Sequence, residues 1–213
     1  MRGENRKAAV MNFLILTGGG NKRIGCDKAF LKVGKATLIE RVLFQINKVK
    51  EREEQIILVG KIPSEKREKL AGEGLKWVED IFPGKGPLGG IYSGLFFSTC
   101  RFNFVLGCDM PFLRWEFIDY MCHLPKNYDI LIPSHSKGIE PLHAIYSRSC
   151  LPVIKEKINR GNFKIQSILP HLKVKFIKEK EIRRFSSPEY IFFNVNTRND
   201  LNKAIEIVEK AGE

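Results

Sequence analysis

Short apolar segments alternate with amphipathic ones along most of the chain. Runs rich in branched and aromatic residues predict strands at 12–16, 56–59, 76–78, 102–107, 129–133, 143–146, 174–177 and 191–194. Residues 37–50 repeat apolar side chains at helical spacing, and Thr37 with Glu40 forms a capping box at the start of that stretch. Thr197 and Asp200 begin a second helix in the same way.

This alternation of strands and helices predicts an α/β fold with a doubly wound, mostly parallel sheet and helices on both faces. No internal repeat, low-complexity tract or long linker divides the chain. We therefore expect residues 1–213 to form one domain, with residues 1–10 as a flexible N-terminal extension. Ligands of such sheets bind at the carboxyl ends of the strands, so candidate site residues are sought there.

Charge and cysteine usage narrow the classes of partner. Thirty-six Lys and Arg against 24 Asp and Glu give a net charge of +12, which favours an anionic partner. No stretch is apolar enough for a membrane-spanning helix. The five cysteines are scattered and show no zinc-site spacing, which favours a reducing cytoplasm. A basic nucleic-acid-binding module is an alternative, but the cations are dispersed and no recognised nucleic-acid motif is present.

The most informative segment is LTGGGNKRIGCDK at residues 16–28, directly after the first predicted strand. Consecutive glycines let backbone N–H groups converge on one anion, and Lys22, Arg23 and Lys28 add positive charge to the same loop. The Rossmann fingerprint fails because Arg23 stands where its third glycine is required. The P-loop fails because Cys26 and Asp27 replace its Lys and Ser or Thr. The segment therefore predicts a triphosphate-binding loop of another kind.

This loop resembles the signature loop of the molybdenum cofactor guanylyltransferases, with Thr17 and Ile24 where that family commonly has Ala and Met. The paired Gly18 and Gly19 favour this family over cytidylyltransferases of similar fold. Four further segments match it in order: DIFPGKGPLGGI at 80–91, GCDMP at 107–111, EPLHAIY at 140–146 and FNVNT at 193–197. The resemblance covers about residues 12–205 and implies the Rossmann-like fold of the nucleotide-diphospho-sugar transferases.

The resemblance implies that GMP is transferred from GTP to molybdopterin with release of pyrophosphate, and that Mg²⁺ is required. Nucleotidyl transfer needs charge neutralisation at the phosphates and no covalent nucleophile, so Cys108 is read as a small buried hydrophobe. Asp109 follows a buried strand and is the predicted Mg²⁺ ligand, although it is also placed to cap the following helix. The resemblance assigns Lys28 to the phosphates near the reacting centre and Arg23 to the triphosphate.

The remaining site residues are less sharply defined. The resemblance assigns the nucleoside to the backbone of Leu16, Thr17 and Gly18 and to Asp80, and it includes Gly19 in nucleotide binding. Asp80 is also typical of a turn before Pro83, although nucleotide contact is favoured. Candidate contacts of the second substrate lie in the matched segments, where each is also suited to satisfying buried backbone groups. These candidates are Lys85, Glu140, His143, Asn194 and Asn196.

Two questions of specificity stay open at this point. The family commonly places an Asn-containing turn after the second main strand, whereas this chain reads Val59-Gly60-Lys61, so GTP is expected first and CTP second. A nucleotidyltransferase of the same architecture that acts on another phosphorylated acceptor, such as a sugar phosphate, cobinamide or lactate phosphate, is the main enzymatic alternative. Transient contacts with other cofactor-biosynthesis proteins are also expected.

Overall fold

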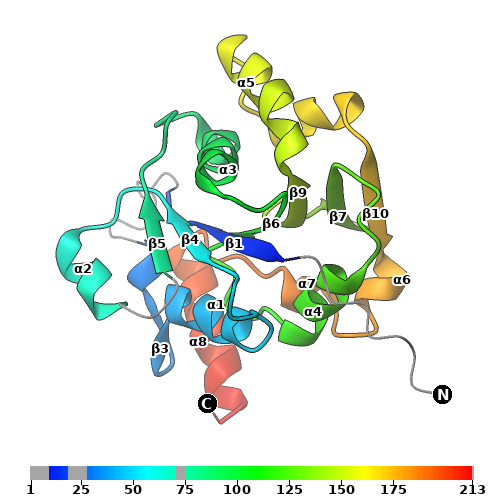
Figure 1. The fold of residues 1–213 in the computed structure, drawn as a ribbon. Coiled ribbons are helices and arrows are strands. Elements are labelled where there is room, and N and C mark those ends of the chain that lie inside the picture. The colour runs from blue at the N-terminus through cyan, green and yellow to red at the C-terminus, as the bar shows by residue number, and fades with distance from the viewer. Residues whose placement is uncertain (1–9, 19–27, 71–74, 213) are drawn as a thin grey trace.

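The computed structural model describes residues 10–18, 28–70 and 75–212 (Figure 1). Within these residues the centre is an eight-stranded sheet with the order β10-β7-β9-β6-β1-β4-β5, in which β8 pairs with β7. The strands are β1 (Met11–Leu16), β4 (Ile56–Val59), β5 (Leu75–Val78), β6 (Phe102–Gly107), β7 (Ile130–His135), β8 (Gly138–Ile139), β9 (His143–Ser147) and β10 (Val174–Lys178). A separate two-stranded hairpin joins β2 (Lys32–Val33) to β3 (Ala36–Thr37).

The sheet is mostly parallel, as the alternating pattern predicts. β1 lies between β4 and β6 and runs parallel to both, while β9 runs antiparallel to β6 and β7. β1 is buried along its whole length, as expected for a central strand covered on both faces. Because β1, β4 and β6 are parallel, the segments that follow them meet at one edge of the sheet.

Helices cover both faces of the sheet (Figure 1). One face packs against α3 (Gly86–Phe97) and α5 (Leu151–Asn159), and the other packs against α1 (Leu38–Asn47) and α4 (Trp115–His123). The shorter elements are η2 (Lys28–Phe30), α2 (Ser64–Lys69), η3 (Arg148–Cys150), η4 (Ile165–His171), α6 (Glu179–Ile182) and α7 (Pro188–Ile191). The chain's last helix, α8 (Arg198–Lys210), packs with the β2–β3 hairpin around a small third cluster of apolar side chains.

The two predicted capping boxes are present. Thr37 Oγ1 accepts a hydrogen bond from the Glu40 N–H, and the Glu40 carboxylate accepts one from the Thr37 N–H. Thr197 and Asp200 make the same reciprocal pair at the start of α8. Each box satisfies two backbone donors that a helix start otherwise leaves unpaired, which is why both starts were readable in the sequence.

The predicted strand at 191–194 is wrong. Ser187 caps a short helix that begins at Pro188, and this α7 ends at Ile191. The residues that follow are irregular and reach the sheet edge through one hydrogen bond, from the Val195 N–H to the Asp109 carbonyl. Ile191 and Phe192 are buried, and the Phe192 ring packs against Phe117 of α4 and His143 of β9 although the segment does not join the sheet. An apolar run alone therefore does not distinguish a strand from a segment packed in the core.

The helices and cysteines of the described residues agree with the sequence pattern. None of their helices combines the length and apolar character needed to cross a membrane. Three of the cysteines among them, Cys100, Cys122 and Cys150, are free thiols. Cys108 is buried in the core, where the sequence reading placed it as a small hydrophobe.

Candidate active site

The carboxyl ends of β1, β4 and β6 are tied together by backbone hydrogen bonds. The Thr17 N–H donates to the Val59 carbonyl over 2.9 Å, and the Cys108 N–H donates to the Leu16 carbonyl over 3.2 Å. These bonds fix the positions of the residues that leave the sheet at this edge. Asp109, one residue beyond Cys108, is therefore held beside the end of the glycine-rich segment.

Lys28, Asp109 and Asn196 meet at this edge from three distant parts of the chain. Lys28 Nζ lies 2.6 Å from Asp109 Oδ2 and 2.8 Å from Asn196 Oδ1. The Lys28 and Asp109 side chains are 19% and 18% exposed, so the ion pair is largely withdrawn from water but still reachable from the surface. The three residues thus form one polar cluster with a positive charge at its centre.

Asp109 has a second carboxylate oxygen that remains without a hydrogen-bond partner among the described residues. This oxygen, Oδ1, is buried. A Cβ added at Gly107 would come within 2.5 Å of it, so glycine at that position leaves the space the carboxylate occupies. A buried carboxylate oxygen without a donor is costly unless a cation or a ligand satisfies it. The arrangement fits a site where one carboxylate oxygen and substrate phosphates share a divalent cation.

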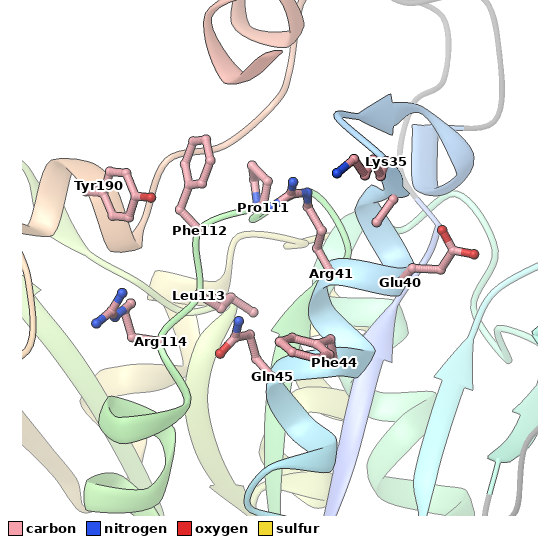
Figure 2. Close-up of a pocket in the computed structure, with 11 residues that line it drawn as sticks. Lys35, Glu40, Arg41, Phe44, Gln45, Pro111, Phe112, Leu113, Arg114 and Tyr190 are labelled. Atoms are coloured by element: carbon pink, nitrogen blue, oxygen red, sulfur yellow. The ribbon is translucent and has the colours of Figure 1, made fainter. Parts of the chain in front are cut away.

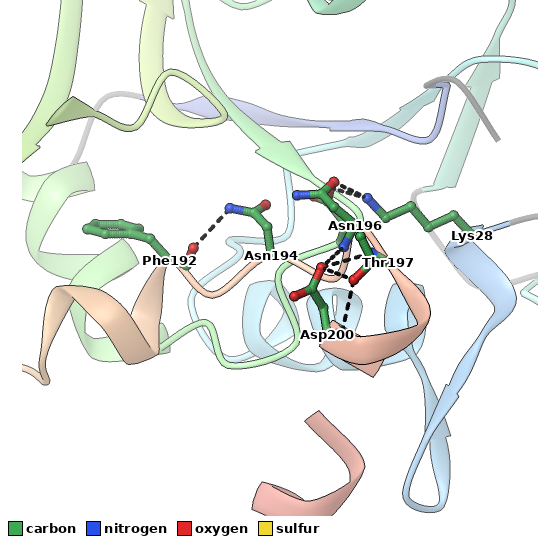
Figure 3. A network of polar contacts seen from close by, with 7 residues as sticks. Lys28, Phe192, Asn194, Asn196, Thr197 and Asp200 are labelled. Atoms are coloured by element: carbon green, nitrogen blue, oxygen red, sulfur yellow. Dashed lines mark hydrogen bonds and ion pairs between the residues drawn. The ribbon is translucent and has the colours of Figure 1, made fainter. Parts of the chain in front are cut away.

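The segment between α7 and α8 brings Asn196 to the cluster (Figure 3). Asp200 Oδ2 accepts hydrogen bonds from the N–H groups of Asn196 and Thr197, at 3.1 and 2.8 Å. Asn194 instead turns back, and its side-chain amide donates to the Phe192 carbonyl over 2.9 Å. The helix cap of α8 therefore also orients Asn196, whose side-chain oxygen reaches Lys28.

A pocket of about 550 Å³ lies at the ends of β1 and β4, next to the start of α3. Five glycines are among its lining residues: Gly18, Gly60, Gly84, Gly86 and Gly90. At Gly60 φ is +131°, and a Cβ there would come within 2.8 Å of Thr17 Oγ1 and 2.9 Å of the Gly18 nitrogen. Any side chain at that position would close the pocket where it meets the glycine-rich loop.

Asp80 lies in the same pocket and also holds its wall in place. Its Oδ1 accepts hydrogen bonds from the Phe82 N–H, at 3.0 Å, and from the Ser93 hydroxyl, at 2.8 Å. Asp80 therefore forms the predicted turn. It also lines the pocket, so the turn is compatible with the predicted contact to the nucleoside. Ser93 belongs to α3, so Asp80 connects the turn after β5 to that helix.

The profile of the MobA-like NTP transferase domain family matches residues 13–175 of this chain. The chain belongs to that family. A probable molybdenum cofactor guanylyltransferase of Pelotomaculum thermopropionicum is 35% identical over 93% of this chain and 93% of its own length. A molybdenum cofactor guanylyltransferase of Desulfosudis oleivorans is 33% identical over 93% of this chain and 96% of its own length.

Solved structures agree with the family assignment. The crystal structure of molybdopterin-guanine dinucleotide biosynthesis protein A from Archaeoglobus fulgidus superimposes with a TM-score of 0.76, at 30% identity, and covers 94% of this chain and all of that one. A 4-diphosphocytidyl-2C-methyl-D-erythritol synthase from Anaerococcus prevotii superimposes with a TM-score of 0.70 at 15% identity, over 95% and 97% of the two chains, which shows a shared fold alone. The family and the nucleotide-diphospho-sugar transferase fold that the motifs predict are thereby confirmed.

The MobA-like family's signature loop is described only at its two ends. Gly19 and Arg23 lie outside the described residues, whereas Leu16 ends β1, Thr17 and Gly18 follow it, and Lys28 begins η2. Thr17 Oγ1 donates to the Val59 carbonyl over 3.0 Å. The ends of the loop thus stand at the glycine-lined pocket and at Asp109.

The five candidate acceptor contacts do not form one group. Asn196 joins the Lys28–Asp109 cluster, and Asn194 lies in the same segment. Lys85 precedes α3, where its ammonium lies 4.7 Å from the centre of the Phe163 ring. Glu140 lies close enough to Asp109 for the two negative charges to interact, and burial raises the pKa of the Glu140 carboxyl above its usual value.

His143 stands apart from the other candidates because it is fully buried in β9. The rings of Phe104, Phe117 and Phe192 surround it with centroid separations of 5.2 to 5.3 Å. Neither ring nitrogen has a hydrogen-bond partner in the part of the chain that the structure describes, and burial lowers the His143 pKa to about 3. A neutral imidazole in this aromatic cage packs the core.

His135 is a site neighbour that the sequence reading missed. Its Nε2 lies 2.8 Å from Glu140 Oε1, across the β7–β8 hairpin. Its Nδ1 accepts a hydrogen bond from the Lys137 N–H, which leaves the proton on Nε2 for donation to the carboxylate. The predicted strand ended at residue 133, but β7 extends to His135, and that extension carries the imidazole to Glu140.

Proposed function

We propose that this chain transfers GMP from GTP to the terminal phosphate of molybdopterin, forming a guanine dinucleotide and releasing pyrophosphate. The observation that carries the proposal is the Lys28–Asp109–Asn196 cluster beside a glycine-lined pocket at the carboxyl edge of the sheet. The names of the relatives supply the guanine and molybdopterin parts of the proposal. The cluster provides the charged groups that can neutralise the phosphates.

The chemistry is an in-line displacement at the α-phosphorus of GTP. An oxygen of the acceptor phosphate forms a bond to that phosphorus, and the bond to the bridging oxygen of pyrophosphate breaks. Negative charge grows on the departing pyrophosphate, so cations fixed before the reaction lower the barrier. Lys28 is such a cation, because Asp109 and Asn196 hold its ammonium from two sides.

Asp109 fits the role of a Mg²⁺ ligand through the oxygen that lacks a partner. Its Oδ2 is occupied by Lys28, while Oδ1 has no donor among the described residues and therefore suits a cation. Bound Mg²⁺ would neutralise phosphate charge and favour departure of pyrophosphate. Lys28 orients the Asp109 carboxylate through the ion pair, and Gly107 keeps the space around Oδ1 open.

The glycine-lined pocket is proposed to hold the guanosine. Its volume of about 550 Å³ lies within the range of small-molecule sites, and Gly18 and Gly60 line it without a side chain that would exclude a purine. Asp80 stands across the pocket as a hydrogen-bond acceptor. The acceptor phosphate is proposed to approach Asp109 from the side of Glu140 and Asn194, whereas His143 is left out because it is buried.

The test is a transfer assay with purified protein, Mg²⁺, molybdopterin and one of GTP, CTP or ATP, with pyrophosphate release and product mass as readouts. GTP is expected to give the highest kcat/KM and a product of the guanine dinucleotide mass. Equal kcat/KM for GTP and CTP would reject the guanine assignment. Replacing molybdopterin by a sugar phosphate, cobinamide or lactate phosphate distinguishes the alternative acceptors, and turnover with one of these alone would reject molybdopterin.

A further inference from the structure

A second and larger pocket, of about 710 Å³, lies on the other face of the sheet (Figure 2). It is bordered by α1, by the segment 111–114 that leads into α4, and by Tyr190 of α7. The glycine-lined pocket adjoins α3, and α1 and α3 pack on opposite faces. We call this second cavity the α1 pocket. It takes no part in the proposed transfer of GMP.

The walls of the α1 pocket are side chains, and several of them are aromatic. Phe112 and Leu113 are nearly buried, and Phe112 stacks on Tyr190 with ring centres 4.7 Å apart. Phe44 lies on the opposite side, on α1, and is 60% exposed. Such an aromatic surface is costly to leave in water and suits a flat apolar ligand.

The charged groups around this aromatic surface are mainly cations. Lys35 and Arg41 stand toward one end of the pocket and Arg114 toward the other (Figure 2). The Glu40 carboxylate is engaged by the N–H and hydroxyl of Thr37 in the capping box. Arg114 lies 3.6 Å from Glu116, an exposed and loose ion pair that leaves its guanidinium accessible. The remaining charge favours a negatively charged group on the ligand.

We propose that the α1 pocket binds a planar aromatic ligand bearing an anionic group, at a site separate from the nucleotide pocket. The ring would pack between Phe44 and the Phe112 side of the pocket, with its anion toward Lys35 or Arg114. Pockets of this size with aromatic walls and a few cations are typical of small-molecule sites. The Gln45 side chain adds a polar group to the wall, and its Oε1 accepts a hydrogen bond from the Trp115 N–H.

Trp115 provides a reporter beside the pocket. The chain contains two tryptophans, so the variant Trp77→Phe leaves Trp115 as the sole source of indole fluorescence. Lys48 on α1 lies near both the Phe44 and the Trp115 rings, at 4.4 and 6.0 Å from their centres. A ligand on this aromatic surface should therefore quench Trp115 or accept its excitation energy.

The experiment uses two probes that share one ring system. 1-Anilinonaphthalene-8-sulfonate carries an anion, and N-phenyl-1-naphthylamine does not. In the Trp77→Phe background the sulfonate is expected to bind at one saturable site and more tightly than the neutral amine. The double variant Lys35→Gln/Arg114→Gln should weaken sulfonate binding about tenfold, corresponding to the loss of charge-assisted contacts, and leave the amine unchanged. Phe44→Ala should weaken binding of both probes.

Matched variants elsewhere control for general effects on surface charge and apolarity. Phe96→Ala removes another exposed aromatic, on α3, and Arg160→Gln removes an exposed cation at the end of α5. Both should leave sulfonate binding unchanged. Saturating GTP with Mg²⁺ should not displace the sulfonate. Absence of a saturable site, equal weakening by the control variants, or displacement by GTP would each overturn the proposal, whether or not the chain transfers GMP.

Discussion

Asp109 and His143 each have buried polar atoms without a hydrogen-bond partner among the described residues, but their surroundings differ. The Asp109 side chain is 18% exposed, pairs with Lys28 and follows the carboxyl end of β6. His143 is fully buried on β9 and enclosed by aromatic rings. An unsatisfied atom of a partly exposed side chain at the carboxyl edge of the sheet can be reached by a ligand, whereas one inside the core has only a packing role. The following substitutions test that distinction.

The largest effect is expected from Asp109→Asn. The substitution keeps the size of the side chain but removes the negative charge, so transfer should fall by about 10²-fold or more as the metal ligand is lost. The fold should survive, because Asn still offers Lys28 an acceptor; the free energy of unfolding should change by only about 1 kcal/mol. Pyrophosphate release and thermal melting on the same sample measure the two effects. Near-normal turnover at low Mg²⁺ would place the metal elsewhere.

Lys28→Met should reduce kcat by roughly 10- to 100-fold, because the cation is most effective when charge develops on the pyrophosphate. Affinity for GTP should change much less than kcat. Lys32→Met, at an exposed lysine of the neighbouring hairpin, is the matched control and should keep normal kinetics. An increase in KM with unchanged kcat would assign Lys28 to ground-state binding instead.

Gly107→Ala tests the space around Asp109 without removing any charged group. The added methyl would lie 2.5 Å from Asp109 Oδ1, so the carboxylate must shift. A shift of a fraction of an ångström at a reacting centre should lower kcat about tenfold. The comparison of kcat with melting temperature separates this effect from misfolding. Unchanged kcat would show that the position of Oδ1 is not critical.

The smallest effect on activity, with a distinct effect on stability, is expected from His143→Phe. Because the folded-state pKa of His143 is lowered to about 3 from 6.5, the unfolded chain takes up a proton first as the pH falls. The stability contribution of His143 is therefore present above pH 6.5 and is lost below it, by roughly 1 kcal/mol per pH unit. His143→Phe should keep normal turnover and unfold less readily than wild type between pH 4 and 6. Denaturant unfolding over this pH range measures the difference, and loss of turnover would contradict the packing role.

Local signals in the sequence predicted the local features of the fold. The capping boxes at Thr37 and Thr197 gave two helix starts, and the apolar run of β6 placed Asp109 at the carboxyl edge of the sheet. Such features depend on neighbours in the chain, which the pattern shows directly. The strand predicted at 191–194 failed because burial by packing and burial in a sheet produce the same apolar run.

The contacts between residues far apart in the chain could not be predicted from the spacing of residues in the sequence. Lys28 and Asn196 are 168 residues apart in the chain, and only the fold brings Nζ and Oδ1 to 2.8 Å. Motif resemblance named both residues but gave no geometry. Motif resemblance also grouped His143 with Glu140, because the two residues share a motif. In the structure the turn before β9 leaves Glu140 near Asp109, whereas His143 lies in the core. The α1 pocket had no sequence signal, since its walls come from four separate parts of the chain.

The proposed mechanism depends most directly on metal binding at Asp109. Mn²⁺ can replace Mg²⁺ as a paramagnetic probe, and its titration into the protein with GTP, followed by electron paramagnetic resonance, measures the site without requiring turnover. We expect one Mn²⁺ bound per chain in the presence of GTP and about tenfold or greater weakening in Asp109→Asn, while Lys32→Met binds as wild type does. Equal Mn²⁺ affinity in wild type and Asp109→Asn would contradict the assignment of Asp109 Oδ1 as the metal ligand.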